Sequence, residues 1–428
     1  MKSQTSLKSI SSYRRALAVR LARFTVALGL TLLLTSAAQA QFAVVHNFTG
    51  GGDGGTPYSG LTLDGAGNLY GTTTVGGSGA NGTVFKLAPH GSNLILTTLY
   101  AFHGGDGSTP TSGVIRDSNG LLYGSTFSGG ANGAGAVFKL TPPARAGGGA
   151  SAAWSESVLY SFTGGNDGEG PDMLGGSLTF DSAGNLYGTT LLGGTVSCRG
   201  NLVFCGSVFE LTDNGGHWTE TTLHQFAGGN DGAGAYGGVV LDSEGNVYGA
   251  TFAGGGINDV CPEGCGTLYQ LVRSNGWMEN ILPVPFCNPD SCLGGQGPNG
   301  IAIDHSGNLY TADADSVLEM RYPYFAGDGE VLSFGTVYYP SGNLIQDSSG
   351  NLYGTDVFGG AFNYGQVFKL TPSGTFTTLH SFSGGADGGE PYGFLVFGTD
   401  GNLYGTASIG GSGSSCQGGC GVVFKVAP

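Results

Sequence analysis

One short motif recurs along the chain and restricts the possible fold more than any other feature. The segment "GNLYGTT" occupies residues 67–73 and returns unchanged at residues 184–190. Five variants complete the series, and the aromatic residues of the seven copies are Tyr70, Tyr123, Tyr187, Tyr248, Tyr310, Tyr353 and Tyr404. Successive tyrosines are 43 to 64 residues apart. Repeats of this length indicate supersecondary units that stack on one another.

Each repeat contains enough alternating segments for a small sheet. In the third repeat, residues 177–181, 185–190, 207–211 and 221–226 alternate between apolar and polar side chains and are bounded by turn-forming residues. None of these segments has a helical period. A four-stranded sheet repeated seven times predicts an all-β fold, namely a seven-bladed β-propeller of four-stranded blades.

The two ends of the repeat series suggest how the ring closes. The series starts with an isolated strand of the fourth type, "AVVHNF" at residues 43–48, and stops after a strand of the third type, "GVVFKV" at residues 421–426. We therefore expect the N-terminal strand to complete the last blade. Such closure leaves no unpaired strand edge.

The composition of the motif has a structural explanation. Asp64, Gly67 and Asn68 suit a hairpin turn, in which the aspartate side chain accepts hydrogen bonds from nearby backbone N–H groups. Gly71 leaves a space that an aromatic residue of the next strand, such as Phe85, can cover. We expect the same turn role for all of the motif aspartates: Asp64, Asp117, Asp181, Asp242, Asp304, Asp347 and Asp400.

The first forty residues differ in character from the rest. They contain six cations and no acid, and an apolar run at residues 24–34 precedes "SAAQA" at residues 36–40. This order predicts a secretory signal peptide over residues 1–40, with Arg14 and Arg15 leaving twin-arginine export open. Residues 41–428 are then a single seven-bladed propeller. The expected location is extracellular, on the cell surface or periplasmic.

Charge excludes several classes of partner. The chain has 15 Lys and Arg against 30 Asp and Glu, and without the leader nine cations remain, for a net charge near −21. Such a surface repels phosphate backbones and anionic lipids, so we expect no nucleic-acid partner. No stretch beyond the leader is apolar enough to insert into a membrane. We expect a monomer whose surface attracts cations, calcium included.

The repeat anchors resemble a known bacterial family. Taken together, "GNLYGTT", "GTVFKL" and "TLHSF" with its following "GG.DG" closely resemble the GloVer tandem-repeat family over essentially the whole of residues 41–428. The resemblance implies an exported, propeller-like protein and no particular activity. Members often carry a C-terminal surface anchor, which we do not expect here. Residues 297–320 also resemble an NHL propeller repeat.

The loops between blades supply one candidate site. Five of them contain a "GG.DG"-like segment with a single carboxylate, and these residues are Asp53, Asp106, Asp167, Asp231 and Asp387. On one interpretation they form a partial ring of carboxylates that binds calcium or a polar ligand, because hard cations take oxygen ligands from loops. On the other, Asp-Gly only makes a tight turn. No other cofactor is indicated.

Eight cysteines form four close pairs in loops on the same face. The pairs are Cys198/Cys205, Cys261/Cys265, Cys287/Cys292 and Cys416/Cys420. Export favours four local disulfides. Zinc is the alternative, but no paired histidines accompany these cysteines.

The inner strands decide which functions are favoured. They offer mainly glycines and hydroxyls, whereas lactonase-type propellers need acids and amides converging on an axial metal. Tyr58, Tyr236, Tyr392 and Asn299 lie near the strand starts, where they grip a sugar ring or peptide or simply fill the channel mouth. We expect a secreted binding or interaction scaffold, with an extracellular glycan or protein as partner. The alternative is an exported hydrolase or lyase, directed at a glycan or lactone, with its site on the same loop face.

Overall fold

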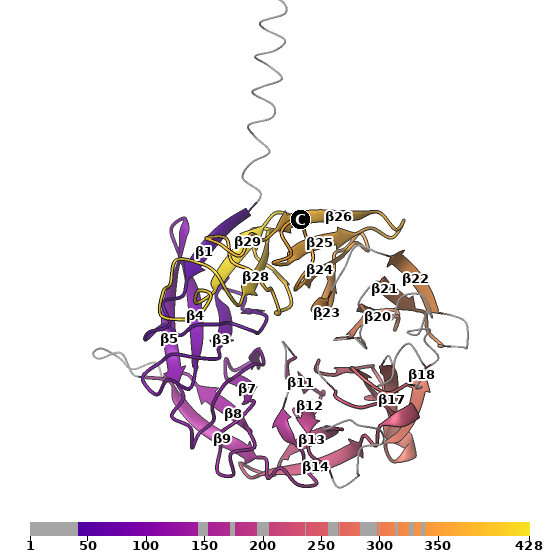
Figure 1. The fold of residues 1–428 in the computed structure, drawn as a ribbon. Coiled ribbons are helices and arrows are strands. Elements are labelled where there is room, and N and C mark those ends of the chain that lie inside the picture. The colour runs from indigo at the N-terminus through magenta and orange to yellow at the C-terminus, as the bar shows by residue number, and fades with distance from the viewer. Residues whose placement is uncertain are drawn as a thin grey trace, which may run out of the picture. The chain divides into compact units, whose positions relative to one another are not determined.

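The structure is a computed structural model. It describes residues 42–143, 153–171, 176–194, 205–235, 237–255, 264, 266–282, 298, 300–312, 316–324, 329–334 and 339–428. Residues Val44–Pro428 form one compact unit. Figure 1 shows seven small sheets arranged around a central axis, which confirms the predicted seven-bladed propeller.

Blades 1 to 3 each contain four antiparallel strands in sequence order from the axis outward. Blade 1 consists of β2 (Thr62–Leu63), β3 (Leu69–Thr73), β4 (Thr83–His90) and β5 (Asn93–Ala101). Blade 2 consists of β6 (Ile115–Arg116), β7 (Leu122–Thr126), β8 (Ala136–Thr141) and β9 (Ser155–Ser161). Blade 3 consists of β11 (Thr179–Phe180), β12 (Leu186–Leu192), β13 (Ser207–Asp213) and β14 (Trp218–Gln225), with β10 (Glu169–Pro171) as an additional partner of β12.

Blades 4 to 7 follow the same plan. Blade 4 consists of β15 (Val240–Leu241), β16 (Val247–Thr251), β17 (Thr267–Val272) and β18 (Met278–Leu282). Blade 5 consists of β19 (Ala302–Ile303), β20 (Leu309–Ala312), β21 (Ser316–Met320) and β22 (Gly329–Phe334). Blade 6 consists of β23 (Pro340–Gln346), β24 (Leu352–Asp356), β25 (Gln366–Leu370) and β26 (Phe376–Ser381). Blade 7 consists of β27 (Val396–Phe397), β28 (Leu403–Ala407), β29 (Val422–Val426) and β1 (Phe42–Asn47).

The second strand of each blade carries the motif, and in every blade except blade 5, which has Thr311 at this position, a ring on the neighbouring strand requires its glycine. Gly71 pairs with Phe85 across β3 and β4. A Cβ atom on Gly71 would lie only 2.6 Å from Cζ of the Phe85 ring. The same arrangement places Phe138 against Gly124 and Phe209 against Gly188. The predicted covering of the glycine by an aromatic residue is therefore confirmed.

The two residues before this glycine pack into different junctions. Leu69 belongs to the apolar cluster between blades 7 and 1, whereas Tyr70 belongs to the cluster between blades 1 and 2. Consecutive strand residues point to opposite faces of a sheet. One Leu-Tyr pair per blade thus fills the junction on each side, so the core consists of separate clusters between the blades.

Closure of the ring agrees with the prediction. β1 pairs with β29 as the outer strand of blade 7, and the Phe48 N–H donates to the Gly421 carbonyl at 3.1 Å. Near the axis, the Thr406 hydroxyl donates to the Ser59 carbonyl at 2.6 Å, which ties blade 7 to blade 1. Thr72 makes the equivalent bond to the Ser112 carbonyl of blade 2, at 2.7 Å. The threonine after the motif glycine therefore links neighbouring blades.

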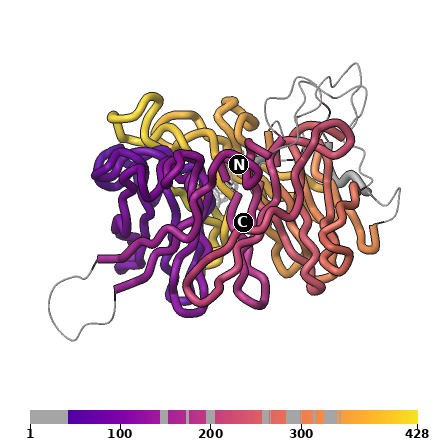
Figure 2. Tube along the Cα trace, turned by 90° about the horizontal axis from the view of Figure 1, so that it is seen from below, coloured from indigo at the N-terminus to yellow at the C-terminus, as the bar shows by residue number. Residues whose placement is uncertain are grey.

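The loops lie at the two rims of the propeller, as the side view in Figure 2 shows. Turns between the first and second strands share one rim with those between the third and fourth strands. The other rim carries the loops between the second and third strands and between successive blades, which we call the loop face. The only helices among the described residues are two short 3₁₀ turns, η2 (Gly229–Asp231) and η3 (Arg273–Asn275). No helix in this part of the chain is long and apolar enough to cross a membrane.

Candidate functional site

The motif aspartates have the turn role expected of them. The Asp64 carboxylate accepts from the backbone N–H groups of Ala66 and Asn68, both at 2.9 Å, and from the Tyr70 hydroxyl at 3.1 Å. These bonds lower the pKa of Asp64 in spite of the opposing effect of burial, which is the largest single contribution. Asp181, Asp242, Asp304 and Asp347 repeat the arrangement. Each hairpin is thus held by its own carboxylate.

Blade 7 departs from this pattern. Gly398 makes the backbone bond to the Asn402 carbonyl that Asp64 makes to Asn68 in blade 1, so it takes the position of the turn aspartate. Asp400 stands two residues later and still accepts from the Tyr404 hydroxyl at 3.0 Å. Asp400 also accepts from the Asn402 N–H at 3.1 Å, so its predicted turn role is confirmed at a shifted position in the turn. The bond to the motif tyrosine is kept.

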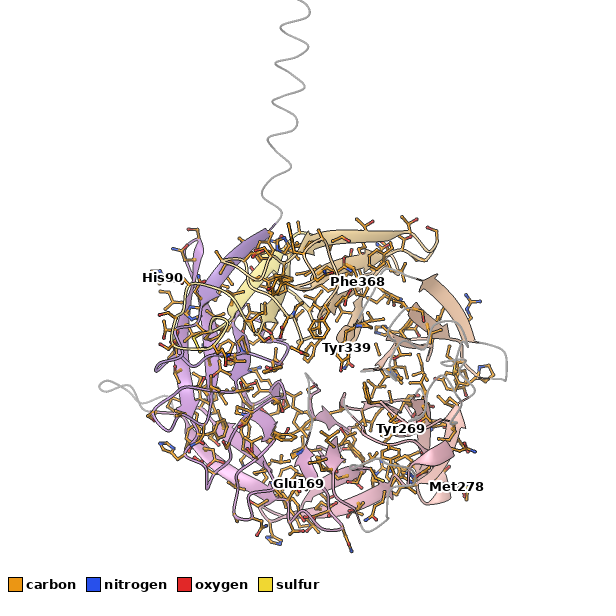
Figure 3. All side chains as sticks on the ribbon, viewed as in Figure 1. His90, Glu169, Tyr269, Met278, Tyr339 and Phe368 are labelled. Carbon is orange, nitrogen blue, oxygen red and sulfur yellow. A yellow bond between two sulfur atoms is a disulfide. The ribbon has the colours of Figure 1, made fainter. Side chains whose placement is uncertain are left out.

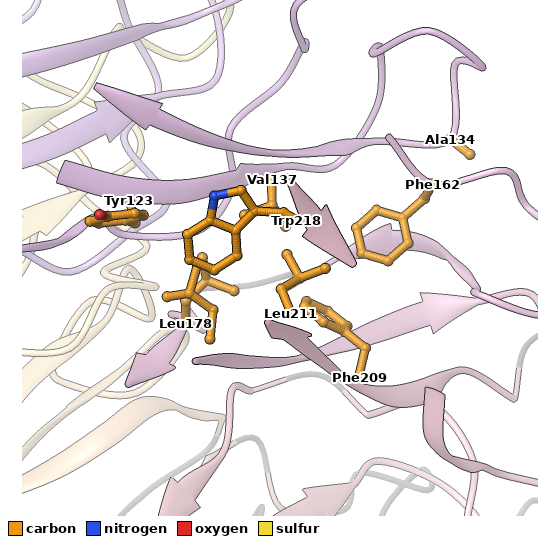
Figure 4. Close-up of a cluster of buried hydrophobic side chains, with 9 residues drawn as sticks. Tyr123, Ala134, Val137, Phe162, Leu178, Phe209, Leu211 and Trp218 are labelled. Carbon is orange, nitrogen blue, oxygen red and sulfur yellow. The ribbon is translucent and has the colours of Figure 1, made fainter. Parts of the chain in front are cut away.

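At the successive junctions from blade 1 to blade 5, an aromatic residue that begins or precedes the outer strand of one blade packs over the motif tyrosine of the blade before it. Trp218 covers Tyr123 with ring centroids 6.3 Å apart, and Trp277 covers Tyr187 at 6.1 Å. Figure 4 shows the first of these pairs above the buried side chains of the junction. Trp154 packs against the cluster that contains Tyr70. The three tryptophans of the chain therefore close three successive junctions.

The junction between blades 4 and 5 differs because it contains a tyrosine in place of tryptophan. Tyr324 covers Tyr248 with ring centroids 5.8 Å apart, and Tyr322 packs edge-on against Tyr324 at 5.4 Å. A pocket of about 440 Å³ lies at this junction. That volume is within the range of small-molecule sites. The pocket is on the rim opposite the loop face.

The lining of this pocket is aromatic and acidic. Its charged and titratable side chains are Asp242, Glu244, Asp304, His305, Tyr248, Tyr322 and Tyr324, and the described lining contains no Lys or Arg. Tyr322 is 61% exposed, which is unusual for a ring of this size. An exposed aromatic face beside carboxylates suits a ligand with hydroxyl groups or a positive charge. It does not suit an anion.

Hydrogen bonds hold the inner wall of the pocket in place. The Gln270 amide donates to the Tyr248 hydroxyl at 2.7 Å, and that hydroxyl donates to Asp242 at 3.0 Å. Burial raises the pKa of Tyr248, and it raises the pKa of Tyr324 to about 12. Tyr324 has a positive φ of 60°, a strained conformation for a bulky residue. Trp277 at the preceding junction has the same conformation, with φ of 64°, so the strain belongs to the turn before the outer strand.

Two of the predicted axial residues lie together. The rings of Tyr58 and Tyr392 are 4.8 Å apart. Burial and the neighbouring Glu390 carboxylate raise the pKa of both tyrosines. The inner edge of blade 6 adds Tyr339, visible in Figure 3. The other two predicted members, Tyr236 and Asn299, lie outside the described residues.

The between-blade aspartates are each bound by their own blade. Asp387 accepts from the Ser383 N–H at 3.0 Å and from the Ser383 hydroxyl, and it lies 3.2 Å from His380 Nε2. Asp167 accepts from the Thr163 N–H at 2.8 Å and from the Tyr160 hydroxyl at 2.9 Å. Asp53, Asp106 and Asp231 have equivalent partners. The carboxylates therefore fasten each loop to the outermost strand of its blade.

The structure does not bring these aspartates together into one site. Among the described residues, the single cluster of three or more potential metal ligands contains only one of them, Asp231. Sequence reasoning missed the partner on the outer strand, and a signal was there. A His or Tyr precedes the aspartate by seven residues in four loops and by six residues at Tyr100 and Asp106. Calcium binding by these loops stays a prediction.

One predicted disulfide is confirmed within the described residues. Cys416 and Cys420 are bonded, with Cα atoms 5.0 Å apart, and the Cys420 carbonyl accepts from the Thr56 N–H at 2.8 Å. This small loop thus packs against the loop of Asp53. Cys205 is also disulfide-bonded. Its predicted partner Cys198 lies outside the described residues, as do Cys261, Cys265, Cys287 and Cys292.

Comparison with protein families agrees with the repeat pattern. A model of the Gloeobacter/Verrucomicrobia repeat matches residues 29–152, 96–317 and 330–428. The chain belongs to this repeat family. The resemblance drawn from the repeat anchors is thereby confirmed. No curated protein matches the sequence.

Solved structures share the propeller fold at low identity. The extracellular domain of BT4673 from B. thetaiotaomicron, described as a one component system, is 13% identical with a TM-score of 0.54, over 90% of this chain and 41% of that one. The chain thus spans less than half the length of that structure. PorZ, a surface component of the type-IX secretion system of Porphyromonas gingivalis, is 14% identical with a TM-score of 0.47, over 90% and 48% of the two chains. A Bacteroides uniformis protein described as a 6-phosphogluconolactonase is also 14% identical with a TM-score of 0.47, over 82% and 89%. The likeness to the BT4673 domain shows the fold alone.

Proposed function

We propose that this propeller is an exported binding module that takes a hydroxyl-rich ligand, a short glycan, in the pocket between blades 4 and 5. The observation that carries the proposal is the open aromatic wall of that pocket. Tyr322 offers an exposed ring against which the C–H face of a sugar can stack, and Glu244 and His305 offer polar atoms beside it. The leader at residues 1–40 supports export.

The charge of the pocket lining restricts the class of ligand further. Three carboxylates line the pocket, and its described lining supplies no cation. A phosphorylated or carboxylated sugar would be repelled. Neutral sugars instead donate hydroxyl hydrogen bonds to carboxylates, and these charge-assisted bonds are stronger than neutral ones.

The test is a glycan array followed by calorimetry on the mature protein. We expect binding of a neutral glycan, and Tyr322→Ala should weaken it about tenfold or more, which corresponds to about 1.4 kcal/mol. Tyr364→Ala is the matched control, because Tyr364 is also an exposed tyrosine, at 43%, and does not line the pocket. It should leave the affinity unchanged.

Other outcomes would contradict the proposal. If Tyr58→Ala or Tyr392→Ala abolished binding while Tyr322→Ala did not, the ligand would sit at the axial tyrosines. If only quaternary ammonium compounds bound, the pocket would recognise charge through its rings and acids. Release of a cleaved glycan or opened lactone in the same assay would favour the enzyme alternative.

A further inference from the structure

Three potential metal ligands meet at the outer edge of the junction between blades 3 and 4. His224 lies on β14, Asp231 ends the η2 turn that follows it, and Glu279 lies on β18 of the next blade. Their ligand atoms all lie within 4.8 Å of one another. His224 Nε2 is 3.1 Å from Asp231 Oδ1 and 3.6 Å from Glu279 Oε1. No other such group occurs among the described residues.

One oxygen in this cluster makes no hydrogen bond among the described groups, although it lies 3.6 Å from His224 Nε2. Glu279 Oε1 is fully buried and has no hydrogen-bond donor among the described groups, and only 12% of the Glu279 side chain is exposed. A buried polar atom without a partner destabilises the fold. A bound cation would satisfy this oxygen.

The ligand set and its spacing indicate the type of ion. Zinc bonds to histidine nitrogen and carboxylate oxygen are about 2.0–2.2 Å long, so tetrahedral ligands lie roughly 3.3–3.5 Å apart. The two observed separations, 3.1 and 3.6 Å, fall just outside that range, so small side-chain movements would bring the ligands to zinc geometry. An imidazole favours zinc or a similar transition metal over calcium, which prefers an all-oxygen set. Three protein ligands leave a fourth position for water or a partner group.

We propose that His224, Asp231 and Glu279 form a zinc-type metal site that fastens blade 3 to blade 4. The site is distinct from the calcium ring considered for the loop aspartates, since it joins one loop aspartate to two outer strands. Side chains of His224 and Asp231 are 19% and 25% exposed, so an ion can enter from solvent.

Two neighbouring junctions supply natural controls. Tyr160, Asp167 and Glu220 occupy the corresponding positions between blades 2 and 3, and the Tyr160 hydroxyl donates to Asp167 at 2.9 Å. Tyr100, Asp106 and Glu156 do so between blades 1 and 2. A tyrosine at the His224 position is therefore compatible with the fold. A neutral phenol, however, is a poor zinc ligand.

The experiment is zinc titration of the chelator-treated mature protein, with its disulfides intact, by calorimetry and thermal unfolding. We expect one zinc per chain and a higher Tm, and His224→Tyr should weaken binding at least about a hundredfold while the protein stays folded. Tyr160→His should create a second site. His46→Tyr is the control, because His46 lies 3.3 Å from Asp53 without belonging to a three-ligand cluster.

The proposal is wrong if His224→Tyr binds zinc as tightly as the original protein, or if the protein binds no zinc. Preference for calcium over zinc would also overturn it. None of these outcomes depends on the glycan pocket, because the two sites share no residue.

Discussion

The two junctions on either side of blade 4 contain the same motif residues but are covered by different aromatic side chains. Between blades 3 and 4, Trp277 covers Tyr187, and the Arg273 guanidinium lies over the indole and 3.6 Å from Asp181. Between blades 4 and 5, Tyr324 covers Tyr248 and a pocket of about 440 Å³ remains. Trp277 and Tyr324 both have positive φ, 64° and 60°. A shorter turn that ends in tyrosine, in place of a longer one that ends in tryptophan, thus distinguishes the open junction from the packed one.

If packing at the junctions stabilises the ring, removal of a whole strand should have the largest effect on stability. A protein that starts at Gly50 lacks β1 and the buried Phe48, whose ring packs on Phe85 at 5.2 Å. We expect a loss of about 4 kcal/mol or more, or aggregation through the exposed edge of β29. Thermal unfolding and light scattering would measure both. The control starts at residue 41, and equal melting of the two proteins would refute closure by β1.

At the packed junction, Trp277→Ala should have the next largest effect. Loss of the indole uncovers the buried Tyr187 ring and removes the surface under Arg273. Because Trp277 is only partly buried, we expect a loss of about 2–3 kcal/mol, at or below the lower end of the cost for a fully buried aromatic residue. Urea unfolding would measure the change in the free energy of unfolding. A loss below about 1 kcal/mol would show that the tryptophan does not close the junction.

The matching change at the open junction should cost less. Tyr324→Ala removes a ring that already borders a pocket, so we expect a loss of about 1–2 kcal/mol in the same urea experiment. Tyr324→Trp, which copies the preceding junction, should narrow the pocket and weaken glycan binding without loss of stability. Equal costs for Trp277→Ala and Tyr324→Ala would mean that the two junctions are packed alike.

Glu156, at the outer edge of the junction between blades 1 and 2, should make the stability of the protein depend on pH. Burial, together with the Asp106 carboxylate, raises the pKa of Glu156 from its ordinary value of 4.5 to about 7. The folded state therefore binds the Glu156 proton more tightly than the unfolded state does. The stabilisation from this proton is complete below pH 4.5 and is lost as the pH rises through about 7. Between pH 4 and pH 8, Glu156 should lower the free energy of unfolding by about 1 kcal/mol, after allowance for solvent screening. Glu156→Gln should abolish that decrease. Urea unfolding at pH 4 and pH 8 would show it, and a difference independent of the mutation would contradict it.

The smallest expected effect concerns Arg273. Its side chain is 45% exposed, and exposed ion pairs contribute roughly 0.5 kcal/mol. Arg273→Gln should therefore destabilise the packed junction only slightly, and less so at high salt. Unfolding at low and high ionic strength would measure this. A loss comparable to that of Trp277→Ala would make the guanidinium, and not the indole, the main element of the junction.

The repeat determined the architecture because its constraints are local. The Gly71–Phe85 contact, the Asp64 turn and the alternation of Leu69 and Tyr70 depend on residues a few positions apart, and each recurs around the ring. The pairing of β1 with β29 also followed from counting strands. In blade 7 the aspartate keeps this turn role two residues later, because Gly398 takes the first position of the turn.

The candidate sites needed the tertiary structure because their members come from different blades. Glu279 is distant in sequence from His224, and only the stacking of blade 4 on blade 3 brings the two within 3.6 Å. Likewise, the sequence does not indicate that Tyr324, with Tyr322 beside it, covers Tyr248. Three other junctions have a tryptophan in that place. A periodic sequence determines how each blade folds. The packing of the blades determines which side chains face one another across a junction. The repeat period carries no information about that packing.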